Sequence, residues 1–242
     1  MPDIATRTVH CAGGLPAFLA VPATDTKVPA IVLMHERYGF VRHSRDLAER
    51  FARDGFVSIA PDFFHKHPDQ AALHRGDVGY DMTDPEAVAY LEAAIAEVAA
   101  LAQVDASRIA VKGVCQTGRH PLVLAAQRPI AAALVWYGAA SQREWQVSAR
   151  YPKPLDEIIA AVECPVLGIF GEADHVISLA DVRRLRDCLD RHDKSYTIKV
   201  YAAAPHGWLN DTMPGRYRRA QALKRNPAQL NTSFLARKRV YS

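Results

Sequence analysis

Hydrophobic residues occur along this chain in two alternating patterns. Residues 28–35 (VPAIVLMH) and 56–64 (FVSIAPDFF) are short, nearly continuous apolar runs, which are typical of strands buried on both faces of a sheet. Residues 44–55 (SRDLAERFARDG) and 84–103 (DPEAVAYLEAAIAEVAALAQ) instead repeat apolar residues at helical spacing. The two patterns alternate along the chain, so strands and helices are predicted to follow one another.

Local signals place the ends of these two helices. Ser44 is a suitable N-cap for the first, and Gly55 closes it. Asp84 is a suitable N-cap for the second, with Pro85 at the first helical position. Residues 65–83 between the second strand and the second helix are polar and irregular, which predicts a loop.

The remaining elements follow from the same criteria. Two strands around a glycine turn are expected first, at residues 6–11 and 15–22. The later elements are a strand at 108–115, a helix at 118–128, strands at 130–138 and 164–174, a helix at 179–193, a strand at 195–203 and a terminal helix from near Pro214. Strands that alternate with amphipathic helices predict an α/β domain over residues 1–242, with a mostly parallel sheet and helices on both faces.

Chemically active residues stand where the predicted strands end. One strand is followed by His35-Glu36-Arg37-Tyr38-Gly39, and three others by Cys115, Asp174 and His206. Ligands bind at the carboxyl ends of strands in such sheets. The chain order of nucleophile, acid and base is that of the α/β-hydrolase triad, and Gly113-Val114-Cys115-Gln116-Thr117-Gly118 matches its strand–turn–helix nucleophile elbow.

Two positions of this elbow depart from the usual pattern. Gly113 fits the need for small residues beside a strained nucleophile, but Thr117 stands where glycine is usual. Pro121 removes a backbone donor from the following helix; it either kinks that helix or lies where the donor is dispensable. Taken alone, Cys115 could also be a small buried hydrophobic residue.

Several segments together make the sequence resemble the dienelactone hydrolase (carboxymethylenebutenolidase) family. They are the H-E-x-x-G segment at 35–39, APDFF at 60–64, GVCQTGR at 113–119, GEADHVIS at 171–178 and PHGWLND at 205–211. The nucleophile of that family is a cysteine, which matches Cys115. The resemblance implies an α/β-hydrolase fold without a large cap domain, no cofactor, and a role in the degradation of aromatic compounds.

The resemblance also implies roles for individual residues. Cys115 is the expected nucleophile, His206 the base, and Asp174 the residue that orients His206. The backbone N–H groups of Arg37 and Gln116 are the expected oxyanion hole. Glu36 is expected to contact the resting thiol and keep it protonated until substrate displaces it. Its alternative is a structural salt bridge with Arg37 or Arg119.

A cysteine nucleophile restricts the substrate. A thiolate leaves a tetrahedral intermediate more easily than an ordinary alkoxide, so an unactivated ester would revert to starting material. We therefore expect an enol-lactone or another activated small-molecule ester, cleaved through a thioester on Cys115 and released by water that His206 activates. In the resembled family two arginines bind the substrate carboxylate, but none follows His206 closely here. Arg75 and Arg216 are the candidates for that role, with Tyr38 and Trp208 as further pocket residues; Trp208 could equally be a core residue.

Composition sets limits on other functions. The formal net charge is +4, but residues 212–242 contain eight Lys and Arg and no Asp or Glu, a tail that we interpret as a solvated face rather than a nucleic-acid site. The cysteines Cys11, Cys115, Cys164 and Cys188 fit neither a zinc pattern nor a disulfide framework. With no signal peptide or membrane-length apolar run, the chain is expected in the cytoplasm, as a monomer or small homo-oligomer. His65, His67 and His74 lie in the polar loop without an acidic partner, so no metal site is expected.

Three alternatives remain open from sequence. The chain could be an esterase for an unrelated small ester, a relative that binds a small ligand without turnover, or a thiol redox sensor that uses Cys115. The ordered acid and base argue against a pure binding protein. No partnered resolving cysteine supports a sensor.

Overall fold

A computed structural model describes residues 3–212, 215–219 and 222. Its strands form one sheet in the order β1-β2-β4-β3-β5-β6-β7-β8. The strands are β1 (Ile4–Cys11), β2 (Leu15–Pro22), β3 (Val28–Leu33), β4 (Val57–Pro61), β5 (Val104–Val114), β6 (Ala132–Trp136), β7 (Val166–Gly171) and β8 (Tyr196–Tyr201). β2 is antiparallel to both β1 and β4, and the strands from β4 to β8 pair in parallel. The predicted mostly parallel sheet is confirmed.

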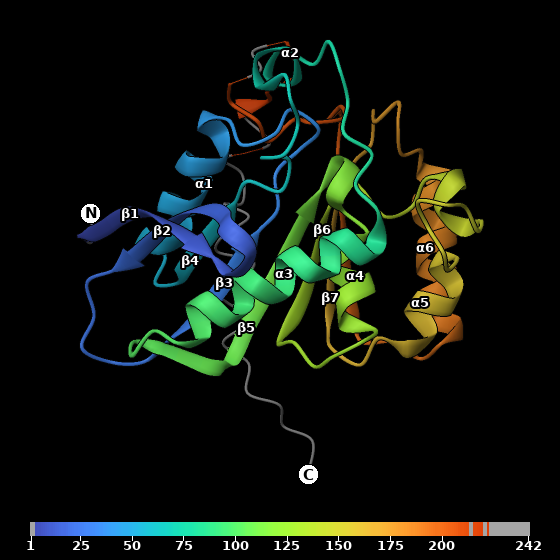
Figure 1. Cartoon of the computed structure of the whole chain (residues 1–242). Coiled ribbons are helices and arrows are strands. Elements are labelled where there is room, and N and C mark those ends of the chain that lie inside the picture. The colour runs from blue at the N-terminus through green and yellow to red at the C-terminus, as the bar shows by residue number, and fades with distance from the viewer. Residues whose placement is uncertain (1–2, 213–214, 220–221, 223–242) are drawn as a thin grey trace.

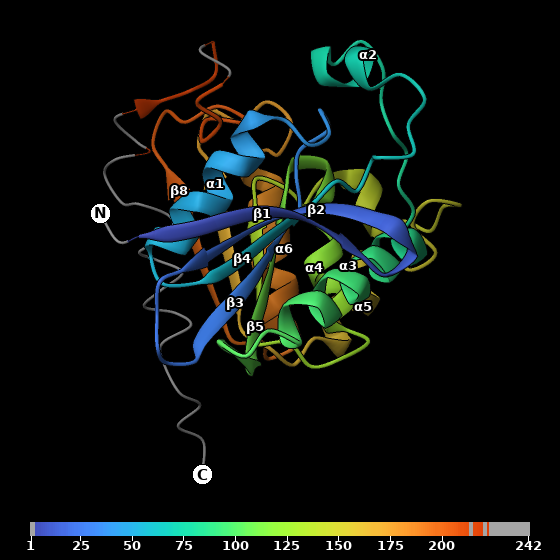
Figure 2. The ribbon, with the colours of Figure 1, turned by 60° about the vertical axis from the view of Figure 1, so that its left-hand side comes forward.

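Helices cover the two faces of the sheet unequally (Figures 1 and 2). One face carries α3 (Asp84–Ala99), α4 (His120–Ala125), α5 (Leu155–Ala161) and α6 (Leu179–Arg191), whose apolar residues share one buried cluster. The other face carries α1 (Arg42–Arg53), which packs with the segment around Trp208 in a second cluster. The sheet is therefore buried on both sides, as its continuous apolar strands require.

Helix α1 begins before the predicted position. Its N-cap is Val41, which makes no side-chain cap, and Ser44 is a buried residue of the first turn. His43 in that turn contacts Asp211, with Nδ1 3.2 Å from Oδ1. This contact spans most of the chain, so a local capping rule could not include it. Gly55 ends the helical segment in a left-handed conformation, as expected.

The start of α3 also differs from the prediction. Thr83 is the N-cap and accepts the Glu86 N–H, so Asp84 is the first helical residue and Pro85 the second. Asp84 is buried and holds Arg119 through two hydrogen bonds, of 3.0 Å from Nε and 2.8 Å from Nη2. Its carboxylate therefore joins α3 to Arg119 at the start of α4 and does not cap its own helix.

Two helices were not predicted at all. α2 (Gln70–Arg75) lies within the segment expected to be a loop, where Asp69 caps it by accepting the Ala72 N–H at 2.8 Å. α5 was missed because its seven residues are too few to show helical periodicity. Short 3₁₀ turns complete the elements at η1 (Ala12–Gly14), η2 (Cys115–Thr117) and η3 (Gln142–Trp145).

The expected terminal helix and basic tail lie mostly outside the described residues. Within the described part, no helix combines the length and apolar character that crossing a membrane would need.

Candidate active site

Strand β5 ends in a sharp turn that presents Cys115. The strand stops at Val114, and Cys115 has φ 53°, a left-handed conformation that non-glycine residues rarely adopt. Gly113 allows this turn, since a Cβ there would lie 2.3 Å from the Thr117 carbonyl oxygen. Gly118 likewise allows close approach to Gly138, where a Cβ would lie 2.7 Å from Cα. The strand–turn–helix geometry is that of a nucleophile elbow.

The two unusual positions of the elbow have structural explanations. The Thr117 hydroxyl accepts the Val114 N–H at 3.0 Å and lies 3.0 Å from the His35 carbonyl, to which it can donate. Threonine thus ties the turn to the end of the neighbouring strand β3. Pro121 is the second residue of α4, where a backbone N–H has no intrahelical acceptor. Its donor is therefore dispensable.

Three side chains from three strand ends form a hydrogen-bonded line. His206 Nε2 is 3.0 Å from Cys115 Sγ, and His206 Nδ1 is 2.9 Å from Asp174 Oδ2. The second carboxylate oxygen of Asp174 accepts the backbone N–H groups of Val176 and Ile177, at 2.7 and 2.9 Å. These bonds fix the carboxylate, which in turn fixes the orientation of the imidazole.

The same contacts set the charge of His206. Burial alone would lower the His206 pKa, but hydrogen bonds to Asp174 and Cys115 outweigh it and raise the pKa to about 10. An imidazolium beside a thiol favours the thiolate. The geometry can therefore supply a charged proton carrier beside the thiol at neutral pH.

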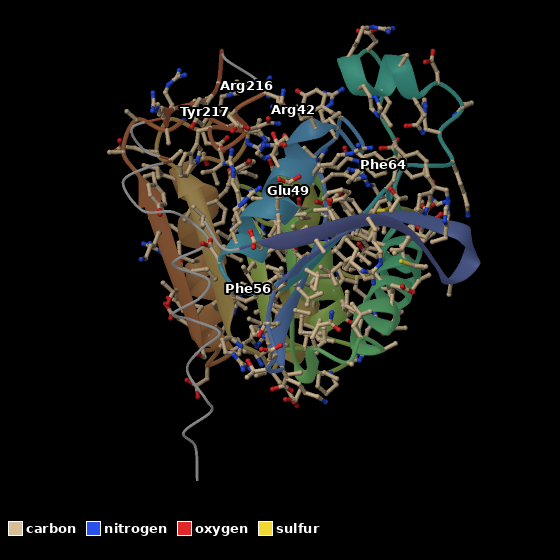
Figure 3. The ribbon with its side chains drawn as sticks, turned by 90° about the vertical axis from the view of Figure 1, so that its left-hand side faces the viewer. Arg42, Glu49, Phe56, Phe64, Arg216 and Tyr217 are labelled. Atoms are coloured by element: carbon tan, nitrogen blue, oxygen red, sulfur yellow. The ribbon has the colours of Figure 1, made fainter. Side chains whose placement is uncertain are left out.

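Cys115 opens into a pocket of about 310 Å³. Besides residues of the triad, its wall includes five of the predicted site residues, namely Glu36, Arg37, Tyr38, Gln116 and Arg216. Arg216 lies at the same end of the molecule as Arg42, the first residue of α1 (Figure 3). α1 follows the carboxyl end of β3, so the pocket stands at the strand ends, where a parallel sheet binds ligands.

Known proteins are similar to this chain in sequence and in fold. The sequence profile of the Dienelactone hydrolase family matches residues 15–236. The chain belongs to the dienelactone hydrolase family. Two relatives are named "Putative carboxymethylenebutenolidase". The one from Methylorubrum extorquens is 29% identical, over 84% of this chain and 70% of the relative. The one from Salmonella typhimurium is 31% identical, over 86% of this chain and 78% of the relative.

A solved structure supports the same assignment. The crystal structure named "Putative Dienelactone Hydrolase" from Klebsiella pneumoniae superposes with a TM-score of 0.83 and 26% identity, and covers 98% of this chain and 100% of that one. The predicted α/β-hydrolase fold is confirmed, and the chain is a carboxylic ester hydrolase of the dienelactone hydrolase family.

Glu36 is not placed as the family resemblance implies. Its carboxylate accepts the Tyr137 hydroxyl at 3.1 Å and the side-chain amide of Asn210. Among the described residues, the hydrogen-bond partner of Cys115 Sγ is His206, and no bond joins Sγ to Glu36. The alternative of a salt bridge is wrong as well: among the described residues none joins Glu36 to Arg37 or Arg119. Arg37 donates to the Gly76 carbonyl at 3.2 Å, and Arg119 binds Asp84. In this chain the thiol is turned toward His206, and Glu36 is held by the neutral donors Tyr137 and Asn210.

Two predicted substrate-binding residues lie elsewhere. Trp208 is fully buried and packs on Tyr201, with ring centroids 4.7 Å apart. Of its two predicted roles, pocket wall or core, the structure therefore shows the core. Arg75 is exposed and pairs with Asp77, with Nε 2.8 Å from Oδ2. Neither residue lines the pocket.

Sequence reasoning missed several residues of the site. Tyr137 directly follows β6, so the search of strand ends that found Cys115 could also have found it. Asn210 lies within the matched segment 205–211 but contacts Glu36 from 174 residues away, a pairing no local pattern shows. Arg143 and His175 also line the pocket.

Metal ligands do not gather at this site. His65 and His67 make local contacts through Nδ1, 2.9 Å from the Asp62 carbonyl and 3.0 Å from that of Asp69. In the described part of the chain, the one group close enough to hold an ion is Asp156, Cys188 and His192. These residues lie outside the pocket, and Arg191 already binds the Asp156 carboxylate at 2.7 Å. A cation there would face the guanidinium.

Proposed function

We propose that this enzyme hydrolyses an enol-lactone, or another activated carboxylic ester, through a thioester on Cys115. The observation that carries the proposal is the 3.0 Å contact between Cys115 Sγ and His206 Nε2, with Asp174 behind the imidazole. A thiol, a base and an orienting carboxylate in this order are the parts that nucleophilic acyl transfer needs.

The reaction begins with attack of the Cys115 thiolate on the ester carbonyl. The carbonyl oxygen becomes an oxyanion, which the backbone N–H groups of Arg37 and Gln116 would stabilise. Both residues border the pocket beside the thiol. The C–O bond of the ester then breaks, the leaving oxygen takes a proton from His206, and a thioester remains on Cys115. Water, deprotonated by His206, attacks the thioester and releases the acid and the thiol.

The leaving group determines which esters react. From the tetrahedral intermediate, a thiolate is expelled in preference to an ordinary alkoxide. The enolate of an unsaturated lactone is stabilised, so it competes with the thiolate and the reaction goes forward. The relatives named for carboxymethylenebutenolidase activity support this lactone class.

The pocket also favours a substrate with a carboxylate. Arg37, Arg143 and Arg216 line it. Arginine binds carboxylates through paired N–H groups. We assign carboxylate binding to Arg216, which borders the pocket near the base: a Cβ on Gly207 would lie 3.5 Å from its Cδ.

A substrate panel tests this proposal. We would measure kcat/KM of the wild-type enzyme for dienelactone, p-nitrophenyl acetate and a simple alkyl ester. The proposal expects dienelactone to be the best substrate and the alkyl ester the worst. Equal rates for alkyl and enol esters would contradict the leaving-group argument. Turnover of p-nitrophenyl acetate alone would point to an esterase for an unrelated substrate.

A further inference from the structure

Lys112 is a buried lysine on the strand that leads to Cys115. It lies on the fully buried half of β5, three residues before Cys115. Its exposed fraction is 2%. Lysine is almost never buried to this extent unless it is paired with an opposite charge. Its neighbours on the strand are apolar or glycine, so the fold of the strand does not explain the choice.

The neighbouring groups satisfy this ammonium only in part. Nζ donates to the Met34 carbonyl oxygen at 3.3 Å and stands 4.6 Å from the centroid of the Trp136 ring. An ammonium carries three donors. Within the described part of the chain, the Met34 carbonyl is its one hydrogen-bond acceptor. A backbone carbonyl and an aromatic face do not neutralise its charge.

The anion available to Lys112 is Glu36. Both side chains border a small cavity of about 10 Å³ below the pocket, room for a single water molecule. Glu36 attracts the Lys112 ammonium electrostatically. The direct hydrogen bonds of the carboxylate come from Tyr137 and Asn210, which carry no charge. Lys112 is therefore a buried cation that can compensate the charge of Glu36 from the side of this cavity.

The other titratable or charged groups around this pair are accounted for. Burial lowers the pKa of His35 to about 4, so its ring is neutral at physiological pH. His43 faces the cavity from α1 and pairs with Asp211. Other titratable or charged groups line the pocket with Glu36: Cys115, Tyr137, His206, Arg37 and Arg216, together with Tyr38, Tyr80, Asp81, Arg143, Glu144 and His175.

We propose that Lys112 is a positioning residue for Glu36, which it holds at the floor of the pocket and away from Cys115. The thiol is then free to pair with His206 before any substrate binds. This inference rests on the proposed role of Cys115 as nucleophile. It differs from the expectation that Glu36 caps the resting thiol, and it explains why Sγ meets His206 and not Glu36 here.

The pair should weaken as the pH rises. Burial lowers the pKa of Lys112 to about 7, although the Glu36 carboxylate acts in the opposite direction. Lys112 is thus charged below pH 7 and loses its charge above it. Its effect on Glu36 should be largest in mildly acidic solution and fade in alkaline solution.

Alkylation of Cys115 by iodoacetamide provides the test. The rate would be measured from pH 5.5 to 9 by mass spectrometry of the Cys115 peptide, in wild type, Lys112→Met, Glu36→Gln and the double variant. Lys153→Met, an exposed lysine paired with Glu157, is the matched control. Below pH 7 we expect Lys112→Met to react about tenfold more slowly, the change that one pKa unit represents. The two rates should converge above pH 8.

The Glu36→Gln background separates this mechanism from a structural role. If Lys112 acts through Glu36, adding Lys112→Met to Glu36→Gln has little further effect on the rate. An equal slowing in both backgrounds, or no slowing in either, would overturn the proposal. Slow alkylation of wild-type Cys115 at pH 7 would instead overturn the proposed nucleophile, and this inference with it.

One comparison does not need a folded Lys112 variant. Wild type and Glu36→Gln should react at similar rates below pH 7, where Lys112 compensates Glu36. Above pH 7 the alkylation rate of the wild type should drop below that of Glu36→Gln. Parallel profiles at every pH would contradict the proposal.

Discussion

At the residue scale, Cys115 depends on contacts that arrive from distant parts of the sequence. Its backbone has a φ of 53°, which costs free energy in a non-glycine residue. The Thr117 hydroxyl and the space left by Gly113 stabilise that turn. His206 and Asp174 then complete the hydrogen-bonded line that the proposed nucleophile needs.

The carboxylate of Asp174 can be tested by removing its charge. For Asp174→Asn we expect kcat/KM for dienelactone to fall by about 10²–10⁴-fold, because the imidazole loses its orientation and its counter-charge. The hydrogen bonds that His206 makes to Asp174 and Cys115 raise the pKa of His206 to about 10. Without Asp174 that pKa falls, so the alkaline limb of the pH–rate profile should move to lower pH.

A pH–rate series from pH 5 to 11 would measure both effects. Asp181→Asn is the control, since Asp181 caps α6 with Ser178 and lies outside the pocket. It should leave the limb in place. An unchanged limb in Asp174→Asn would contradict the assigned role of Asp174.

At the scale of elements, β5, η2 and α4 form one unit that requires glycine at its closest approaches. A Cβ on Gly113 would meet the Thr117 carbonyl oxygen at 2.3 Å and Pro121 Cδ at 2.7 Å. Thr117 belongs to the turn and Pro121 to the helix that follows it, so a shift of either would displace Cys115. The elbow is therefore rigid because its own backbone is close-packed.

Substitution of Gly113 should measure this packing. We expect Gly113→Ala to lower the free energy of unfolding by about 3 kcal/mol, the cost of overpacking a site that cannot relax. Gly79→Ala is the matched control, because nothing lies within 4 Å of a Cβ placed there. Denaturant titration of both variants decides the matter. Equal stability of the two would show that the elbow adapts.

The sequence predicted elements and their order better than it predicted their ends. Continuous apolar runs identified the core strands, and the residues after them identified Cys115, Asp174 and His206. The start of α3 was wrong because Asp84 binds Arg119, 35 residues further along the chain. The surroundings of Glu36 could not be predicted, because Tyr137 and Asn210 reach it from 101 and 174 residues away. Local sequence patterns predict the helices and strands, whereas the side-chain contacts between distant residues depend on the assembled sheet.

At the scale of the whole molecule, the strand ends bring charges of both signs to one pocket. Arg37, Arg143 and Arg216 line the same pocket as Glu36 and Asp81. Such an arrangement suits a substrate with an anionic end that faces the arginines and a reacting carbonyl that faces the thiol. Exposed charges are screened by salt, so binding of an anionic substrate should weaken as ionic strength rises.

Removal of Arg216 tests this arrangement. We expect Arg216→Ala to raise KM for dienelactone about tenfold, in line with the loss of one charge-assisted hydrogen bond. The KM for uncharged p-nitrophenyl acetate should change little. Arg75→Ala is the control, since that exposed arginine pairs with Asp77 outside the pocket. Equal changes for both substrates would contradict a carboxylate-binding role.

The most direct test of the account is dienelactone hydrolysis by wild type and Cys115→Ala, with Cys188→Ala as the control. Burial raises the pKa of the Cys188 thiol to about 11, so that thiol should not react. The account predicts that wild type and Cys188→Ala turn over dienelactone and that Cys115→Ala does not. Turnover by Cys115→Ala at the wild-type rate would show that Cys115 is structural and that the proposed nucleophile is wrong.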